Sequence, residues 1–305
     1  MNISITIRHA LSYYAVLSVL AACSGNAANV PAQPPDGIRS AKSKSRTFAY
    51  TGGEQSFRVP ANVTSISVVA DGAAGASDKG IARGGRTQAA IPVTPGETLY
   101  VFVGGRGASP AGGFNGGGSG GNYTPCVTRS CSFGGGGASD VRQGGDGVNN
   151  RILVAGGSGG HGYADFTGGL GGAKVGGKGH GGPAGGQRGR AGFGGTKNHG
   201  GAGGAGGDGF GNPGSPGALG VGGTGGNADK TSGNHFINCG GGGGGGYYGG
   251  GGGGSGSKGS GSFGGGSGGS GGGGSSFVES SAGAVHLYQG WQTDTGDGVI
   301  VFTWH

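Results

Sequence analysis

Glycine is concentrated in one part of the chain, and this distribution restricts the possible folds more than any other sequence feature. Of the 92 glycines in 305 residues, 68 lie in residues 134–274, whereas residues 1–133 hold 20 and residues 275–305 hold four. Collagen is excluded because glycine does not recur strictly at every third position and proline is scarce. The sequence therefore predicts a glycine-rich insert, residues 134–274, between two flanks of more ordinary composition.

The insert repeats the triplet Gly-Gly-X, for example in residues 168–172 and 200–207. A left-handed extended helix of the polyproline II type has three residues per turn and no internal hydrogen bonds, so this repeat leaves two of its three edges bare. Neighbouring helices can then approach closely and exchange hydrogen bonds, which satisfies their backbone N–H and C=O groups. We therefore expect an ordered bundle of polyglycine II helices.

A flexible linker is the alternative interpretation, because Gly/Ser-rich chains behave as random coils. Residues 249–276 in particular have the composition of a linker. The glycine-rich region also contains aromatic residues at fairly regular intervals, which favour order because linkers rarely contain them. These are Phe133, Tyr163, Phe166, Phe193, Phe210, Phe236, Tyr247, Tyr248 and Phe263.

The flanks carry the alternation of apolar and polar residues that is typical of β-strands. Neither flank is long enough to bury its apolar face alone, so the last strand should pack against the first ones. We expect an all-β fold in which residues 47–133 and 275–305 form one small β-sandwich. Strand-like runs lie at residues 48–50, 57–59, 64–70, 91–93, 99–103 and 298–304, with one further strand near 151–155 inside the insert.

Residues 1–22 have the pattern of a secretory signal peptide, in which Arg8 precedes an apolar stretch. The sequence Leu-Ala-Ala-Cys that ends at Cys23 resembles the bacterial lipobox, which implies that this cysteine is acylated and becomes the first residue of the mature protein. Ser24 follows it, and the resemblance then favours the outer membrane or cell surface. A conventional cleavage site with an incidental cysteine is the alternative.

Residues 23–46 predict a flexible basic tether, because they are rich in Pro, Ser and Ala and end in a basic cluster. Residues 47–305 hold 15 Lys and Arg against 12 Asp and Glu, so their net charge is small. No basic run alternates with aromatic residues as in a nucleic-acid module. We expect attachment to a membrane through the N-terminal lipid and no nucleic-acid partner.

Six short motifs occur in a fixed order along the chain. They are QSFRVP at 55–60, VTSISV at 63–68, DGAAG at 71–75, VTPGETL at 93–99, GGGGASDVR at 134–142 and ILVAGG at 152–157. The set resembles bacterial glycine-rich surface proteins. It is also similar to the glycine-rich extracellular region of the anaplastic lymphoma kinase and leukocyte tyrosine kinase receptors.

This resemblance covers residues 47–305 and implies a TNF-like, jelly-roll β-sandwich with an inserted bundle of polyglycine II helices. In those receptors the region binds protein ligands. The sequence lacks the set of motifs that kinase chemistry needs, namely the Gly-rich loop, the Lys, HRD and DFG. We therefore expect no kinase activity. None of the receptors' ligand-contacting residues can be placed on this chain.

Three cysteines remain if Cys23 is acylated. Cys126 and Cys131 are the preferred candidates for a disulfide, and closure of the insert through Cys239 is the alternative. Their spacing is not that of a zinc site, so we expect no metal on these thiols.

Three histidines, His161, His180 and His199, recur 19 residues apart beside glycine. In stacked hairpins they would form a ladder that binds a transition metal, and otherwise they would occupy exposed edge positions. We expect no metal and no other cofactor. Asp140 and Arg142, in the fifth motif, are expected to cap or to pair where a strand meets the glycine bundle rather than to react.

These observations predict a non-enzymatic, surface-anchored lipoprotein. The first hypothesis is a binding or adhesion module for a protein or glycan ligand, presented by the side chains of a rigid glycine bundle. The alternative is a self-associating structural component of the cell envelope or matrix. The two hypotheses differ in whether the protein stays monomeric and saturable or assembles with concentration.

Overall fold

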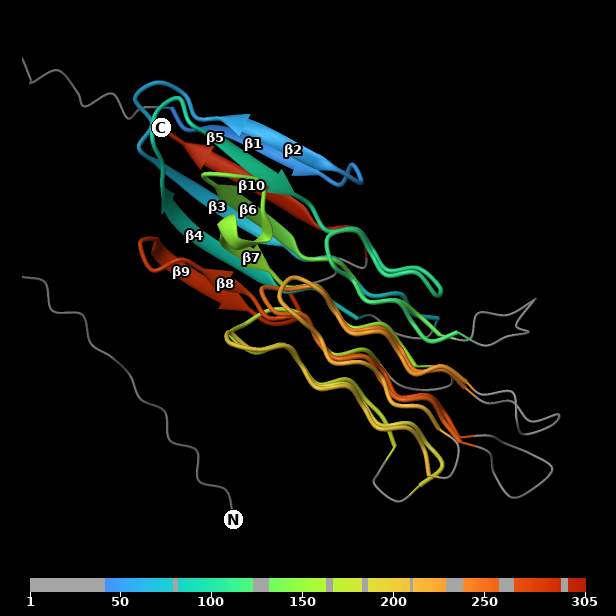
Figure 1. Ribbon diagram of the computed structural model, residues 1–305. Coiled ribbons are helices and arrows are strands. Elements are labelled where there is room, and N and C mark those ends of the chain that lie inside the picture. The colour runs from blue at the N-terminus through green and yellow to red at the C-terminus, as the bar shows by residue number, and fades with distance from the viewer. Residues whose placement is uncertain are drawn as a thin grey trace, which may run out of the picture. The chain divides into compact units, whose positions relative to one another are not determined.

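A computed structural model describes residues 42–78, 82–122, 132–162, 167–182, 186–208, 211–228, 238–257, 266–291 and 296–305. These residues form an all-β fold of two five-stranded antiparallel sheets, arranged as a β-sandwich (Figure 1). One short 3-10 turn, Val148–Asn150, joins two strands, and the described residues contain no α-helix.

The first sheet has the strand order β1-β10-β3-β4-β9, and the second has the order β2-β5-β6-β7-β8. The strands are β1 (Lys44–Ala49), β2 (Glu54–Arg58), β3 (Ser65–Asp71), β4 (Arg86–Pro92), β5 (Thr98–Phe102), β6 (Ser139–Gln143), β7 (Arg151–Ala155), β8 (Phe277–Val278), β9 (Gly283–Tyr288) and β10 (Val299–Trp304).

The last strand packs against the first ones, as the sequence predicts. β10 lies between β1 and β3 and pairs with both of them in antiparallel register. Its inward residues Ile300 and Phe302 are fully buried, and the Phe302 ring packs edge-on against Phe48 and Phe57 at centroid distances of 5.0 and 5.2 Å. Alternating burial along β3 and β4 completes the apolar core between the sheets.

The sandwich extends beyond the predicted bounds at its N-terminal side. Lys44, Ser45 and Arg46, expected in the tether, belong to β1 and pair with the end of β10. The Arg46 guanidinium lies 4.8 Å from the centre of the Phe48 ring. A basic residue can join this strand because β1 is an edge strand, where charged side chains are tolerated and discourage further pairing.

The predicted insert also contributes to the sandwich. β7 confirms the strand expected near residues 151–155, and β6, which the sequence did not predict, pairs with β5 and β7. β6 is buried although it contains charged residues, so it shows no alternation that would reveal it. Its Arg142 Nε donates a 2.7 Å hydrogen bond to Asp140 Oδ1, which confirms the expected pair.

Glycine-rich segments leave the sandwich from one end of both sheets and run side by side (Figure 1). The ladder between β3 and β4 continues into them through a hydrogen bond from Gly72 N to Gly85 O. A Cβ on Gly72 would lie 2.2 Å from the carbonyl oxygen of Gly156, which follows β7 in the other sheet. The two sheets can therefore converge here only because glycine lets their backbones touch.

Candidate functional site

The glycine-rich segments form a laterally hydrogen-bonded array, which we call the glycine array. Its centre is made of residues 238–247, 249–257 and 266–276, where nearly every residue is buried. Residues 249–257 and 266–276 are the stretch that resembles a linker in composition, so the linker interpretation is wrong for this described part. A Cβ added to any of its glycines would lie only 1.8–2.1 Å from a backbone oxygen of another segment. The packing of the backbones therefore leaves no room for a side chain at these positions.

Hydrogen bonds in the centre repeat every three residues. Gly240 N donates to Gly226 O, Gly241 N to Gly269 O and Gly242 N to Phe133 O, so three consecutive residues reach three different segments. The next three donors repeat the pattern one triplet further on, to the carbonyls of Gly223, Gly272 and Gly136. The backbone polar groups of the array are thus satisfied without the ladder of a conventional sheet.

The outer segments leave one residue of each triplet exposed. In residues 200–208 the exposed positions are Ala202, Ala205 and Asp208, and in residues 221–228 they are Val221, Thr224 and Asn227. Glycines occupy the inward positions, where they donate hydrogen bonds to the centre. We call these exposed non-glycine residues edge residues. The array therefore fixes rows of edge residues on its outer face.

Three antiparallel outer segments, residues 175–182, 186–195 and 200–208, lie next to one another. Gly179 N donates to Gly192 O across the first boundary, and Phe193 N donates to Ala202 O across the second. Their edges enclose a groove of about 590 Å³ with a floor of glycine and alanine. The side chains around this floor are those of Lys178, His180, Arg190 and Phe193.

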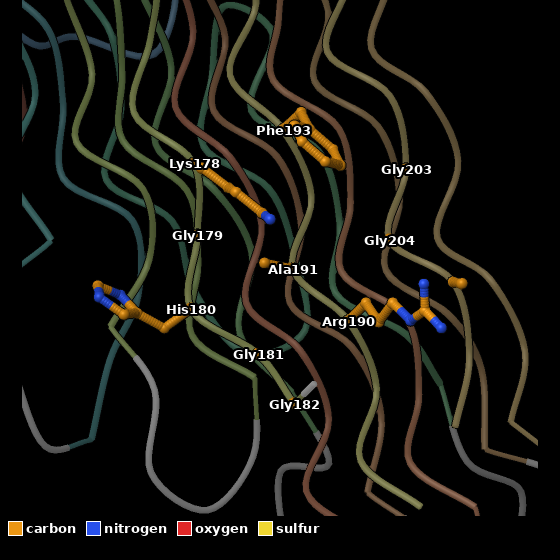
Figure 2. Close-up of a pocket in the computed structure, with 11 residues that line it drawn as sticks. Lys178, Gly179, His180, Gly181, Gly182, Arg190, Ala191, Phe193, Gly203 and Gly204 are labelled. Atoms are coloured by element: carbon orange, nitrogen blue, oxygen red, sulfur yellow. The ribbon is translucent and has the colours of Figure 1, made fainter. Parts of the chain in front are cut away.

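The groove combines positive charge with an exposed aromatic ring. The Nζ atom of Lys178 lies 4.4 Å from the centre of the Phe193 ring, and 48% of Phe193 is exposed. Figure 2 shows Lys178 reaching toward Phe193 on the neighbouring segment and Arg190 extending toward the segment of Gly203 and Gly204. A cation this close to an aromatic face is held in place by the ring's negative face.

Charge is strongly one-sided around the groove. Residues 167–208 contain five Lys and Arg and one acidic residue, Asp208 at the end of the third segment. Among the described residues, neither Lys178 nor Arg190 forms a salt bridge. The small net charge of residues 47–305 therefore hides a local cationic surface.

The histidine ladder, the weaker of the two alternatives for these residues, is not assembled by the described residues. His161 is 2% exposed, with Nδ1 3.0 Å from Ser77 Oγ and 3.8 Å from Asp78 Oδ1. His180 and His199 are exposed, and Nδ1 of His180 lies 2.7 Å from Thr167 Oγ1. In the described part of the chain, no group of three or more His, Cys, Asp or Glu side chains is placed to hold a metal ion.

His161 differs from both expectations because it follows β7 into the interior of the array, where its ring packs edge-on against Phe133. Burial lowers the pKa of His161, an effect that the Asp78 carboxylate opposes. Its Nε2 atom is buried without a hydrogen-bond partner, so a proton there would be poorly accommodated.

Cys239 is a buried free thiol at the start of the central segment 238–247. Burial raises its pKa to about 11, which makes it a poor nucleophile at neutral pH. Cys126 and Cys131, the preferred disulfide pair, lie outside the described residues, as does Cys23, the predicted lipidation site.

Two ion pairs, one partly buried and one buried, lie where the sandwich meets the array. Arg86 makes two hydrogen bonds of 2.6 Å to the carboxylate of Asp71, at the ends of β4 and β3. Asn115, from the array, donates to Asp140 Oδ2 at 2.7 Å and thereby links the second pair to the glycine-rich segments. These charged residues are all engaged in structural contacts, so they fix the junction rather than form an open site.

Comparison of the chain with protein-family models and with curated proteins finds no match in either set. Within the described residues, no helix has the length and apolar character needed to cross a membrane. The function is therefore inferred from the array and its groove.

Proposed function

We propose that the protein is a non-enzymatic binding module, held at the cell envelope by a lipid on Cys23, that recognises a protein or glycan through the edge residues of its glycine array. The observation that carries this proposal is the fixed outer face of the array. Side chains such as Lys178, Arg190 and Phe193 project from backbones that are hydrogen-bonded on several sides. A surface ordered before binding loses little conformational entropy when a ligand arrives.

In this proposal the array is a bundle of polyglycine II helices. A three-residue helical repeat turns successive N–H groups by about 120°, so each should meet a different neighbour. The donors Gly240, Gly241 and Gly242, with acceptors in three separate segments, support this assignment. The single exposed residue per triplet in the outer segments supports it as well.

The two antiparallel sheets and the glycine-rich insertion are consistent with the TNF-like architecture of the anaplastic lymphoma kinase and leukocyte tyrosine kinase ectodomains. Ligand binding by those receptors supports a recognition role for this chain. The glycine-rich segments extend from one end of both five-stranded sheets. In this proposal the sandwich is therefore the base that carries the recognition surface.

The experiment uses intact cells that produce the full chain, compared with cells that produce the Cys23→Ala variant. We expect protease and antibody to reach the wild-type domain on intact cells, and the variant to be released or mislocalised. The wild-type cells should also bind saturably to at least one member of a panel of immobilised glycans and surface proteins.

Sedimentation of the detergent-solubilised protein separates this function from the structural alternative. A monomer whose sedimentation does not change with concentration supports the binding module. Concentration-dependent assembly, together with protection of the domain until the envelope is broken, would instead identify a self-associating envelope component.

A further inference from the structure

We propose that the groove lined by Lys178, Arg190 and Phe193 binds an acidic polysaccharide, specifically a chain that carries uronic-acid carboxylates. This inference rests on the proposed binding function and names the ligand class and the site. It follows from the shape of the groove, its charge and the spacing of its cations.

The floor of the groove suits a flat, extended ligand. It is built from Gly179, Ala191 and Gly203, together with adjacent glycines, so no long side chain rises from it. Phe193 stands at its border with 48% of its surface exposed. Sugar rings present apolar C–H faces that pack on such an aromatic ring, while their hydroxyl groups stay in water.

The charges of the groove select an anionic ligand. Lys178 and Arg190 project from adjacent segments that are held in antiparallel register, by hydrogen bonds such as Gly179 N to Gly192 O. Neither cation is neutralised by a salt bridge among the described residues. A guanidinium can bind a carboxylate with two parallel hydrogen bonds, and a lysine adds a point charge beside it.

The spacing of the cations favours a polysaccharide over a nucleic acid. Arg190 lies one triplet from Phe193 on the same segment, and Lys178 lies beside Phe193, so the two cations are about one triplet, or roughly 9 Å, apart along the groove. Nucleic acids carry one phosphate per roughly 3.4 Å of each strand and are bound by dense cationic surfaces. A polymer with one carboxylate per one or two sugar rings matches two cations at this separation better.

The test measures binding of the full-length, detergent-solubilised protein to a galacturonic acid hexamer by calorimetry. A neutral glucose hexamer and a 12-nucleotide single-stranded DNA are the comparison probes. The variants are the double substitution Lys178→Gln/Arg190→Gln and the single substitution Phe193→Ala. The matched control is Lys174→Gln/Lys197→Gln, which removes two exposed cations that adjoin these segments but do not line the groove.

We expect saturable binding of the uronate hexamer that weakens at least about tenfold in the Lys178/Arg190 variant, since each charge-assisted hydrogen bond contributes roughly this factor. Phe193→Ala should also weaken binding, whereas the matched control should change it less than about twofold. All of these positions are exposed, so the thermal unfolding temperature should stay close to the wild-type value in every variant.

Equal losses in the groove variant and the matched control would overturn the site, because the effect would then be general electrostatic attraction. Tighter binding of the DNA than of the uronate would overturn the ligand class. Absence of uronate binding would overturn the inference as a whole. If the same protein still binds a neutral glycan or a surface protein saturably, the proposed function survives that failure.

Discussion

Replacement of a central glycine by alanine tests the packing of the glycine array directly. Gly253 lies in the segment 249–257, and a Cβ added there would be 2.0 Å from the carbonyl oxygen of Gly269. Since real Cβ atoms essentially never approach closer than 3.0 Å, the two segments would have to separate by about 1 Å or more. Three hydrogen bonds around this position, each 2.8 Å long, would be stretched: Gly253 N to Gly241 O, Gly226 N to Gly253 O and Gly269 N to Gly254 O.

The expected magnitude follows from these contacts. Three weakened backbone hydrogen bonds cost about 3 kcal/mol, and overpacking adds about 1 to 3 kcal/mol. The smaller conformational entropy of alanine in the unfolded chain offsets about 0.4 to 1 kcal/mol of this loss. Gly253→Ala should therefore lower the free energy of unfolding by about 3 to 6 kcal/mol, equivalent to a fall of roughly 6–24 °C in the unfolding temperature.

Differential scanning calorimetry of the full-length protein measures this effect. Gly53→Ala is the matched control, because no atom lies within 4 Å of a Cβ built on Gly53. The control should change stability by less than about 0.5 kcal/mol. If Gly253→Ala unfolds at the same temperature as the control, the close lateral contact between residues 249–257 and 266–276 does not exist in solution.

Three further predictions concern buried polar groups. Asp140→Asn should lower stability by about 3 to 5 kcal/mol in chemical denaturation, because Arg142 keeps a buried charge without its partner, whereas the exposed Asp208→Asn should have little effect. The lowered pKa of His161 means that the folded state disfavours its protonation, so its contribution to stability is fully present above about pH 6.5 and is lost as pH falls through the folded-state pKa. The unfolding temperature of the wild-type protein should therefore fall between pH 7 and 4, and His161→Gln should make this fall smaller. An unchanged pH profile in the variant would contradict the assignment of this effect to His161. Cys239, fully buried with a pKa of about 11, should resist iodoacetamide at pH 8 in the native protein and react in 8 M urea, as mass spectrometry of the alkylated peptide would reveal.

Much of the sandwich could be predicted from local pattern. Alternation identified β2, β3 and β5, and the aromatic C-terminal run identified β10, because a strand with one buried face repeats its apolar residues every second position. β6 and β9 were missed for opposite reasons. β6 is buried on both faces and neutralises its own charges, whereas β9 is exposed along most of its length.

The glycine repeats alone are enough to favour packing of backbone against backbone in the glycine-rich region. A run such as residues 240–246 has no side chain on any edge, so it suits a position surrounded by other segments, and Gly-Gly-X suits a position with one free edge. This follows from sterics alone, because a Cβ excludes the close approach that lateral hydrogen bonds between such segments require.

Which edge residues meet depends on how the segments are arranged in space. Lys178 and Phe193 are 15 positions apart in the chain, and their contact depends on the register of two antiparallel segments and on where each segment reverses. The triplet repeat is nearly the same in every segment, so the sequence pattern alone does not distinguish one lateral neighbour from another. For the same reason it did not reveal that His161 is buried while His180 and His199 are exposed, because position within the array, rather than local sequence, determines their burial.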